Sequence, residues 1–193
     1  MTKNYKIGFT RPALLREIVI LAQLYTDHQD WQRVREEVIK ENLLQTRTAR
    51  SSEVLYGEMQ KRLSLLNSEQ IELIADDYEG DVRQLVWMSI CKQYPFVGDF
   101  VLEIVAPAIA SGRQSIDYDD YGYFFNAKAE WHQELEKVSE KTRSNARGAV
   151  FQMMRQCGLL TESNDLVPQM ISAALQNCSS ESDLALIPGA IRL

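Results

Sequence analysis

Apolar residues recur every three or four positions along most of this sequence, and that spacing predicts helices rather than strands. Leu14, Ile18 and Leu21 fall on one side of a helix, and the pattern resumes over 31–39 and over 54–66. Two strongly apolar stretches, 81–93 and 96–110, then follow each other. Pro107 should kink or interrupt the second, because proline donates no backbone N–H. We therefore predict an all-α protein with these two stretches at the centre of its core.

Composition places the chain among ordinary globular proteins. Its 193 residues are 45% apolar and 25% charged, which suffices for a sizeable core in one or two domains. The net charge of −6 argues against indiscriminate binding of polyanions, although clustered basic residues can outweigh it locally. Cys91, Cys157 and Cys178 are too few and too scattered for a disulfide framework or a zinc site. We expect reduced thiols in a cytoplasmic protein.

The hydropathy of the chain predicts no membrane span. The N-terminus is basic, but no long apolar region follows it, so we expect no signal peptide. The most apolar segment, 101–110, is about half as long as a membrane span. It also contains Glu103 and Pro107, so the protein is not expected to cross a membrane.

The composition changes at Ser111–Ser115, where we place a domain boundary. The predicted domains are an N-terminal helical domain over 1–113 and a C-terminal domain over 114–193. The segment Asp117–Phe125 near the start of the second domain mixes acidic and aromatic residues. Its rings are expected to pack the second domain onto the first. The alternative is an acidic and aromatic docking surface for a partner.

The C-terminal domain has the sequence pattern of a helix-turn-helix with a small β wing. A helix over Trp131–Val138 is followed by the polar turn Ser139–Lys141 and a second helix from Thr142. The turn-forming cluster Thr161–Asp165 then separates two apolar pairs, as the two strands of a wing would require. Residues 170–175 predict a further short helix, and regular structure is expected to end at Pro188-Gly189.

Catalytic chemistry finds little support in the sequence. The two histidines, His28 and His132, lie far apart among ordinary helix residues, and no phosphate loop, metal-ligand spacing or nucleophile motif is present. The acidic doublets Asp76-Asp77 and Asp119-Asp120 are better explained as solvated surface charge than as metal ligands. We expect a non-enzymatic protein without a cofactor or a metal.

A basic helix is the strongest functional signal. In a helix over 142–158, Ala146, Val150, Met153 and Cys157 form one apolar stripe, while Ser144, Arg147, Gly148, Gln152 and Arg155 fall on the opposite half. Residues 141–161 contain four basic side chains and no acid. The N–H groups at a helix N-terminus and nearby hydroxyls suit phosphate, and arginine and asparagine can also bond base edges. The candidate nucleic-acid-binding residues are Lys141, Thr142, Arg143, Ser144, Asn145, Arg147 and Arg155, with Arg47 and Arg50 as an extension of the track. The alternative is a solvated basic face that binds nothing.

Five groups of residues spread over the chain carry a resemblance to a known family. They are Gly8-Phe9-Thr10 with Leu14–Glu17, Asn42–Leu44 with Thr46–Ala49, Arg62-Leu63 with Leu66, Trp87 with Cys91-Lys92, and Thr142-Arg143 with Gly158–Leu160. In these residues the chain as a whole resembles the BrxA family of BREX phage-defence systems. The resemblance implies an all-helical, two-domain cytoplasmic protein that binds DNA beside other BREX proteins: a methyltransferase, an ATPase and a phosphatase-like protein. It also implies a core similar to that of NusB-type antitermination proteins, which keeps RNA open as a ligand.

The leading hypothesis is a DNA-binding accessory protein of a BREX system that contacts the phosphate backbone of double-stranded DNA through the basic helix. Arginine–phosphate contacts release counterions, so binding should depend strongly on salt. The competing hypothesis is a protein-interaction scaffold that docks a basic partner on Asp117–Phe125.

Overall fold

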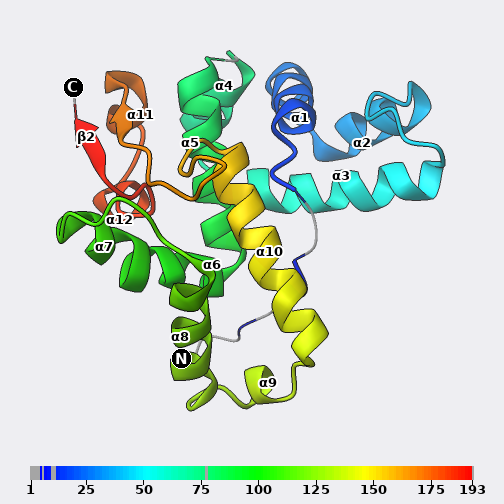
Figure 1. Ribbon diagram of the computed structural model, residues 1–193. Coiled ribbons are helices and arrows are strands. Elements are labelled where there is room, and N and C mark those ends of the chain that lie inside the picture. Colours follow the sequence, from blue (N-terminus) through cyan, green and yellow to red (C-terminus); the bar gives the residue numbers. More distant parts are fainter. Residues whose placement is uncertain (1–4, 6, 10–11, 77, 193) are drawn as a thin grey trace.

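The structure is a computed structural model that describes residue 5 and residues 7–9, 12–76 and 78–192. Helices make up most of these residues, and the strands form only one short pair (Figure 1). The all-α prediction is confirmed. None of the helices in the described ranges is long and apolar enough to cross a membrane.

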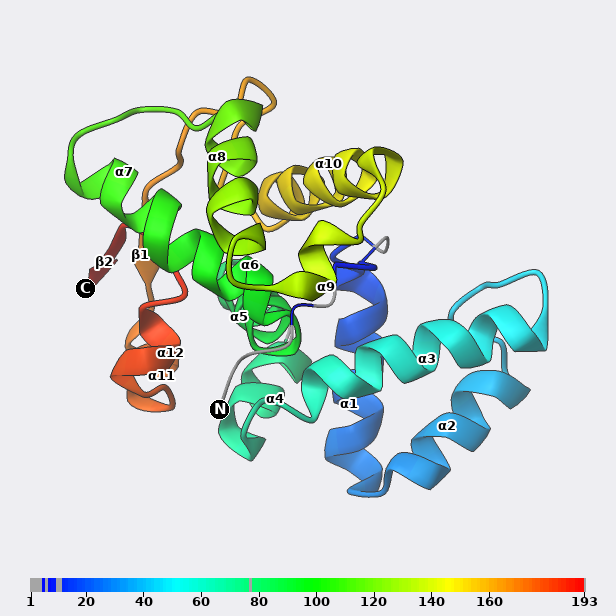
Figure 2. The same ribbon diagram turned by 90° about the horizontal axis from the view of Figure 1, so that it is seen from below.

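Four helices form the first part of the fold: α1 (Leu15–His28), α2 (Trp31–Lys40), α3 (Ala49–Leu63) and α4 (Ser68–Ala75). Polar residues in extended conformation cap three of them: Asp30 for α2, Thr48 for α3 and Asn67 for α4 each accept a hydrogen bond from the first turn. α2 and α3 run back along each other as a hairpin that projects from the rest of the molecule (Figures 1 and 2).

The centre of the core is α5 (Glu79–Gln93), followed directly by α6 (Pro95–Phe100). α5 is buried on nearly all sides from Asp81 to Cys91, and all of α6 after Pro95 is buried. A helix enclosed all round needs apolar residues on every face rather than one stripe, which is the composition of this stretch. The predicted place of 81–93 and 96–110 at the centre of the core is confirmed for α5 and α6.

The predicted interruption before Pro107 takes the form of a π-helix. η1 (Val101–Val105) joins α6 to α7 (Ala106–Ala110) without a break in the helical path. Proline has no N–H, and its ring would clash with the carbonyl four residues earlier in an α-helix. The wider π turn, in which the Ala106 N–H bonds the Val101 carbonyl, accommodates it.

The chain then passes through α8 (Tyr118–Ala129), the single turn α9 (Gln133–Glu136) and the long α10 (Glu140–Gln156). Three rings of α8, those of Tyr121, Phe124 and Phe125, are buried, and all three pack edge-on against Phe96 of α6. The expectation that the rings of Asp117–Phe125 pack against the first half of the chain is confirmed for these three.

The C-terminal segment corrects two predictions. The helix predicted over 170–175 begins later than expected: Gln169–Ile171 is strand β1, and the helix is α11 (Ala173–Asn177). Regular structure also continues past Gly189, because strand β2 (Ala190–Arg192) pairs in parallel with β1, Met170 opposite Ile191. β2 lies about twenty residues after β1 in the chain, so no local sequence pattern could predict that the two strands pair.

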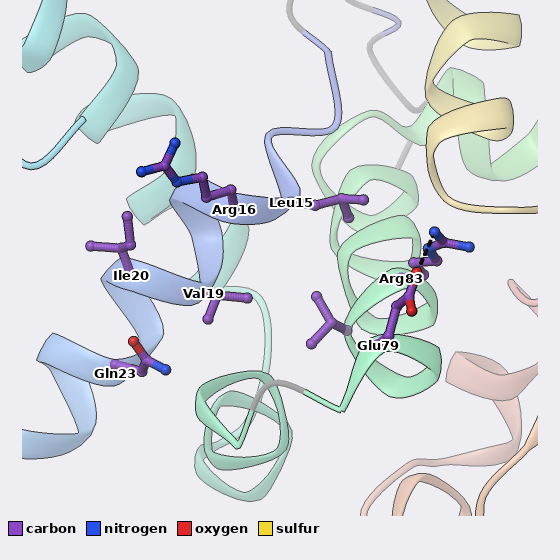
Figure 3. A pocket seen from close by; sticks show the side chains of 8 residues that line it. Leu15, Arg16, Val19, Ile20, Gln23, Glu79 and Arg83 are labelled. Atoms are coloured by element: carbon purple, nitrogen blue, oxygen red, sulfur yellow. Dashed lines mark ion pairs between the residues drawn. The ribbon is translucent and has the colours of Figure 1, made fainter. Parts of the chain in front are cut away.

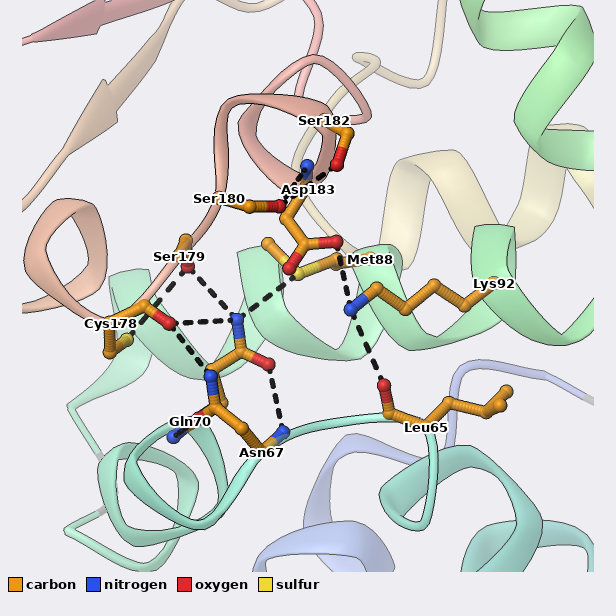
Figure 4. Close-up of polar contacts among 10 residues, drawn as sticks. All are labelled: Leu65, Asn67, Gln70, Met88, Lys92, Cys178, Ser179, Ser180, Ser182 and Asp183. Carbon is orange, nitrogen blue, oxygen red and sulfur yellow. Dashed lines mark hydrogen bonds and ion pairs between the residues drawn. The ribbon is translucent and has the colours of Figure 1, made fainter.

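Polar contacts hold this segment against the helical core (Figure 4). Gln70 at the start of α4 donates through Nε2 to the Cys178 carbonyl at 3.3 Å and to the Ser179 hydroxyl at 3.0 Å. Lys92 of α5 forms an ion pair of 2.8 Å with Asp183 of α12 (Glu181–Leu184). The indole N–H of Trp87 donates to the Leu186 carbonyl at 2.9 Å.

One hydrophobic core extends through the described residues from Tyr5 to Ile187. This core includes residues on both sides of the predicted boundary at position 113. Hydrogen bonds also join the two sides, such as that from the Ala13 N–H to Oε1 of Gln156 at 2.8 Å. The independent folding of 1–113 and 114–193 stays a prediction, as does the resemblance of the core to NusB.

Candidate nucleic-acid interface

The basic helix α10 begins two residues earlier than predicted. Ser139 is its N-cap and accepts a hydrogen bond from the Thr142 N–H at 3.2 Å, while its hydroxyl lies 2.9 Å from that of Thr142. Glu140 therefore lies in the first turn, where its carboxylate interacts favourably with the positive end of the helix. The protein's own Ser139 and Glu140 therefore already satisfy part of the hydrogen-bonding capacity and positive charge at the N-terminus of α10.

The apolar stripe of α10 lies where the periodicity predicted. Ala146, Val150, Met153 and Cys157 are all buried, and so is Leu160 beyond the helix end. Burial raises the pKa of the Cys157 thiol to about 12, so this cysteine stays protonated in the core. The opposite side of α10 carries the exposed Ser144 and Gln152.

Two predicted arginines lie against α8. The guanidinium of Arg143 stacks over the Phe125 ring, 4.4 Å from its centroid, and donates to the Gly122 carbonyl at 3.2 Å. The guanidinium of Arg147 lies 4.5 Å from the centroid of the Tyr118 ring. Both side chains are half-buried rather than freely solvated. Stacking on a ring fixes the plane of a guanidinium and leaves its charge in place.

The charges of these arginines reach into the core. Burial raises the pKa of Tyr121, and the positive charges of Arg143 and Arg147 nearby offset part of that shift. Nε of Arg147 is enclosed and has no hydrogen-bond partner among the described residues. The stem of Arg147 is therefore held by packing.

The third arginine, Arg155, is held by the hairpin that follows α10. Its Nη2 donates to Oδ1 of Asn164 at 2.5 Å, while its Nε is enclosed without a partner among the described residues. The hairpin has one antiparallel bridge, between Leu160 and Leu166, and Thr161 caps its turn by accepting from the N–H groups of Ser163 and Asp165.

A third extended segment covers the hairpin along one edge. Leu166 donates its N–H to the Gln114 carbonyl at 2.7 Å, and the Ile116 N–H donates to the Asn164 carbonyl at 3.2 Å. The predicted wing is present as this small hairpin, tied to the chain just before α8.

A shallow hollow of about 550 Å³ runs along the outward side of α10. It brings together three predicted residues, Ser144, Asn145 and Arg155, with Gly148, Ala149 and Gln152. No acidic side chain lines it in the described part of the chain. Gly148 has no atom within 4 Å of where its Cβ would lie, so the backbone is open to close approach there.

Lys141 and Thr142 are exposed at the start of α10, whereas Arg47 and Arg50 lie elsewhere. Arg47 lies between α2 and α3, and Arg50 lies in the first turn of α3; both are exposed. This end of the α2–α3 hairpin projects well away from α10 in both views (Figures 1 and 2). The structure therefore brings seven of the nine candidate residues onto one helix and separates the other two.

Two features of the candidate site were not predicted from the sequence. Gln152 was placed on the outward half of α10 without being assigned to the site, although it lines the hollow. The rings of Tyr118 and Phe125, seven residues apart on α8, hold arginines four residues apart on α10. Residues seven apart and residues four apart each fall on one face of a helix, and this was the available signal.

A second hollow, of about 480 Å³, lies between α1 and α5 (Figure 3). Leu15 and Val19 line it from α1, and Arg16 lies at its border. Arg83 points away from α1 and pairs with Glu79 at 2.5 Å. Because its lining mixes apolar side chains with the Glu79–Arg83 ion pair, this hollow does not extend the acid-free basic site on α10.

Metal-binding clusters of histidine, cysteine and carboxylate are absent from the residues that the structure describes. Asp120, from one of the two acidic doublets, is occupied by Arg113, which donates two hydrogen bonds to its carboxylate at 2.9 and 2.7 Å. Asp77, from the other doublet, lies outside the described residues.

The fold and the site together define a helical protein with a basic helix mounted on an aromatic partner helix. A family model described as BrxA matches residues 3–183, and the chain belongs to the BrxA family. The BREX protein BrxA of Escherichia coli O9:H4 (strain HS) is 22% identical over 147 residues, 76% of this chain and 69% of that protein. This membership supports an accessory role in a BREX phage-defence system.

The fold has a counterpart among solved structures. The crystal structure of an uncharacterized protein from Magnetospirillum magneticum aligns with a TM-score of 0.80 at 20% sequence identity. The alignment covers 97% of this chain and 100% of that one. The two proteins therefore share a fold over their whole length.

Proposed function

We propose that this chain is a non-enzymatic accessory protein of a BREX phage-defence system that binds double-stranded DNA through α10. The observation that carries the proposal is the hollow on α10, which is lined by small and polar side chains and flanked by cations held in fixed positions. Fixed arginines lose little conformational freedom when a phosphate binds. In this proposal the protein acts in the cytoplasm.

Each basic group has a distinct role. Lys141, exposed at the start of α10, meets the phosphate backbone as a mobile point charge. Arg143 and Arg147 keep their charge while stacked on α8, and Arg155 offers donors at the far end of the hollow. Ser144 and Asn145 donate to phosphate oxygens between them.

The surrounding elements fit a compact variant of a helix-turn-helix. α9 is only one turn long, so α8 rather than α9 is the helix that supports α10. α10 is the recognition helix and the hairpin 159–167 is the wing, which lies beside the DNA backbone. Arg47 and Arg50 contact DNA only if the duplex reaches the α2–α3 hairpin.

The direct test adds negative charge inside the hollow without disturbing the packing. Ser144→Glu and Gln152→Glu change exposed residues, so the fold should persist. In a mobility-shift titration with duplex DNA we expect the double variant to lose about tenfold or more in affinity. A matched control carries Arg16→Glu and Lys61→Glu, exposed cations on α1 and α3, and should bind better than the hollow variant although its net charge is more negative.

Arg143→Glu with Arg147→Glu tests the arginines themselves. Because both pack on α8, the unfolding temperature of this variant must be measured beside its DNA affinity. Unchanged affinity for duplex DNA in both the hollow variant and this folded variant would rule out the proposed site on α10. Equal losses of affinity in the hollow variant and its control would show that binding depends only on overall charge.

The identity of the nucleic acid is tested by competition. A duplex DNA should compete more strongly than a duplex RNA of the same sequence, and binding should weaken steeply with salt. Stronger competition by the RNA would favour the RNA-binding alternative. The methyltransferase, ATPase and phosphatase-like protein of the BREX system are the proposed protein partners.

A further inference from the structure

Helix α8 has two unlike sides. Its inner side is buried: Tyr121, Phe124 and Phe125 pack into the core. Its outer side carries Tyr123, 76% exposed, and leads into Trp131, which is 82% exposed just beyond the helix. Asp119, Tyr123, Asn126, Ala127 and Glu130 fall within about 60° of one direction at 100° per residue, and all are exposed. With Trp131 they form what we call the acidic–aromatic face.

Two large exposed rings on one short surface are unusual. Tryptophan and tyrosine are enriched among the residues that dominate binding energy at protein interfaces. The Trp131 N–H bonds the Lys128 carbonyl at 3.1 Å, which places this residue on a well-defined turn. Tyr123 is thus presented by α8 itself and Trp131 by the turn that follows it.

The carboxylates of this face have no internal cation. Asp119 and Glu130 form no ion pair among the described residues, whereas Asp120 on the adjacent side is taken by Arg113. The only lysine of α8, Lys128, turns away and pairs with Glu103 at 2.6 Å. The face therefore attracts cations and repels nucleic acid.

The other side of α8 shows which cation suits such a surface. There the Tyr118 and Phe125 rings each carry an arginine of α10, at 4.5 and 4.4 Å. The outer side offers two more rings, those of Tyr123 and Trp131, together with carboxylates, but no arginine of the described chain lies over them. A guanidinium can stack on a ring while bonding a carboxylate in two places, which an ammonium cannot do.

We propose that the acidic–aromatic face, Tyr123 and Trp131 with Asp119 and Glu130, binds an arginine-rich segment of a partner protein. The face lies apart from the hollow on α10, so a partner and DNA can be bound at the same time. This inference does not depend on the proposed DNA binding.

A short arginine homopeptide is the probe, with the lysine and glutamate homopeptides of equal length as comparisons. Trp131 reports on binding because Trp87 is fully buried and Trp31 is stacked on Tyr25 at 4.0 Å. We expect the arginine peptide to change the Trp131 emission saturably and to bind several-fold more tightly than the lysine peptide. The glutamate peptide should not bind.

Calorimetry with the full chain separates this face from general acidity. Tyr123→Ala with Trp131→Ala should weaken the arginine peptide about tenfold, whereas Tyr78→Ala, another exposed aromatic, should leave its affinity unchanged. Asp119→Asn with Glu130→Gln should also weaken it. Glu36→Gln with Glu41→Gln, which removes the same charge from α2, should have less effect.

Three outcomes would overturn the proposal. The first is equal affinity for the arginine peptide in the face variants and their controls. The second is the absence of any saturable binding of that peptide. The third is binding of duplex DNA that changes the Trp131 emission, when the Tyr123/Trp131 variant no longer binds that DNA. The last result would assign the face to nucleic acid.

Discussion

At the scale of single residues, the buried Arg62 shows how the chain joins parts that lie far apart in sequence. Its side chain has no exposed surface. It donates to the carbonyls of Pro12 and Ala13 at 3.2 and 2.9 Å, to Gln93 at 3.1 Å and to Glu58 at 3.3 Å. Two of these acceptors are backbone carbonyls that precede α1, so the buried guanidinium ties the start of the chain to α3 and α5.

Replacing Arg62 by methionine should therefore be costly. The change leaves the Pro12 and Ala13 carbonyls without this donor and breaks the ion pair with Glu58, and breaking a buried pair in this way costs about 3–5 kcal/mol. Urea unfolding followed by circular dichroism measures the loss. Arg33→Met, at a position 71% exposed, is the control and should change stability by no more than about 0.5 kcal/mol. Similar values for both variants would show that Arg62 does not link these segments.

Replacing two glycines of the α10 region by alanine should change the stability of the protein in opposite directions. Gly158 ends the helix with φ +74°, and the next residue bonds back to the Met154 carbonyl, so Gly158→Ala should destabilise by about 1 kcal/mol. Gly148 lies mid-helix with open space around it, so Gly148→Ala should stabilise by about 0.5–1 kcal/mol. Thermal unfolding of the two variants checks the signs. A stabilised Gly158→Ala protein would contradict the left-handed helix end.

At the scale of elements, the start of α8 is set by local polar groups. Asp117 caps the helix by accepting from the N–H groups of Asp119 and Asp120, and Asp120 accepts in return from the Asp117 N–H at 2.9 Å. This reciprocal capping was readable in the sequence Asp-Tyr-Asp-Asp. The side of α8 that is buried was not, because both sides carry aromatic rings.

The same element predicts a pH dependence. Hydrogen bonds from Arg113 hold the pKa of the Asp120 carboxyl below its ordinary value of about 3.9. Because the pKa is lower in the folded state, the interaction with Arg113 stabilises the protein at pH values above the ordinary pKa. This contribution is lost as the pH falls through the lower, folded-state pKa. The stability lost in Asp120→Asn should therefore be larger at neutral pH than at pH about 3. Equal losses at both pH values would rule out this linkage.

At the scale of the whole molecule, the core joins everything from Tyr5 to Ile187. Trp87 of α5 bonds the Leu186 carbonyl, and the N–H of Ala13 bonds the side chain at the end of α10. These links tie the first and last parts of the chain to the same central helices. Separate unfolding of the parts would expose apolar surface on each of them.

We therefore expect one cooperative unfolding transition for the full chain. Tryptophan fluorescence, to which the core residue Trp87 contributes, and circular dichroism, which reports on all helices, should give the same midpoint in urea. Two separated transitions, each assignable to one side of residue 113, would instead support the division into domains 1–113 and 114–193.

The sequence alone determined the features that depend on neighbours along the chain. Helical spacing predicted the helices, and the stripe from Ala146 to Cys157 predicted which side of α10 is buried. These patterns are local because a helix satisfies its backbone within itself. They suffice for the class of fold and for locating the basic helix.

Only the tertiary structure decided the rest. It paired β1 with β2, turned 170–175 from a predicted helix into a strand and α11, and placed Arg143 and Arg147 on the rings of α8. It also sorted the aromatic residues of 117–131 into buried Tyr121 and exposed Tyr123 and Trp131. The reason is that each of these outcomes depends on a segment distant in sequence, and the energy of such a contact exists only after the chain has folded.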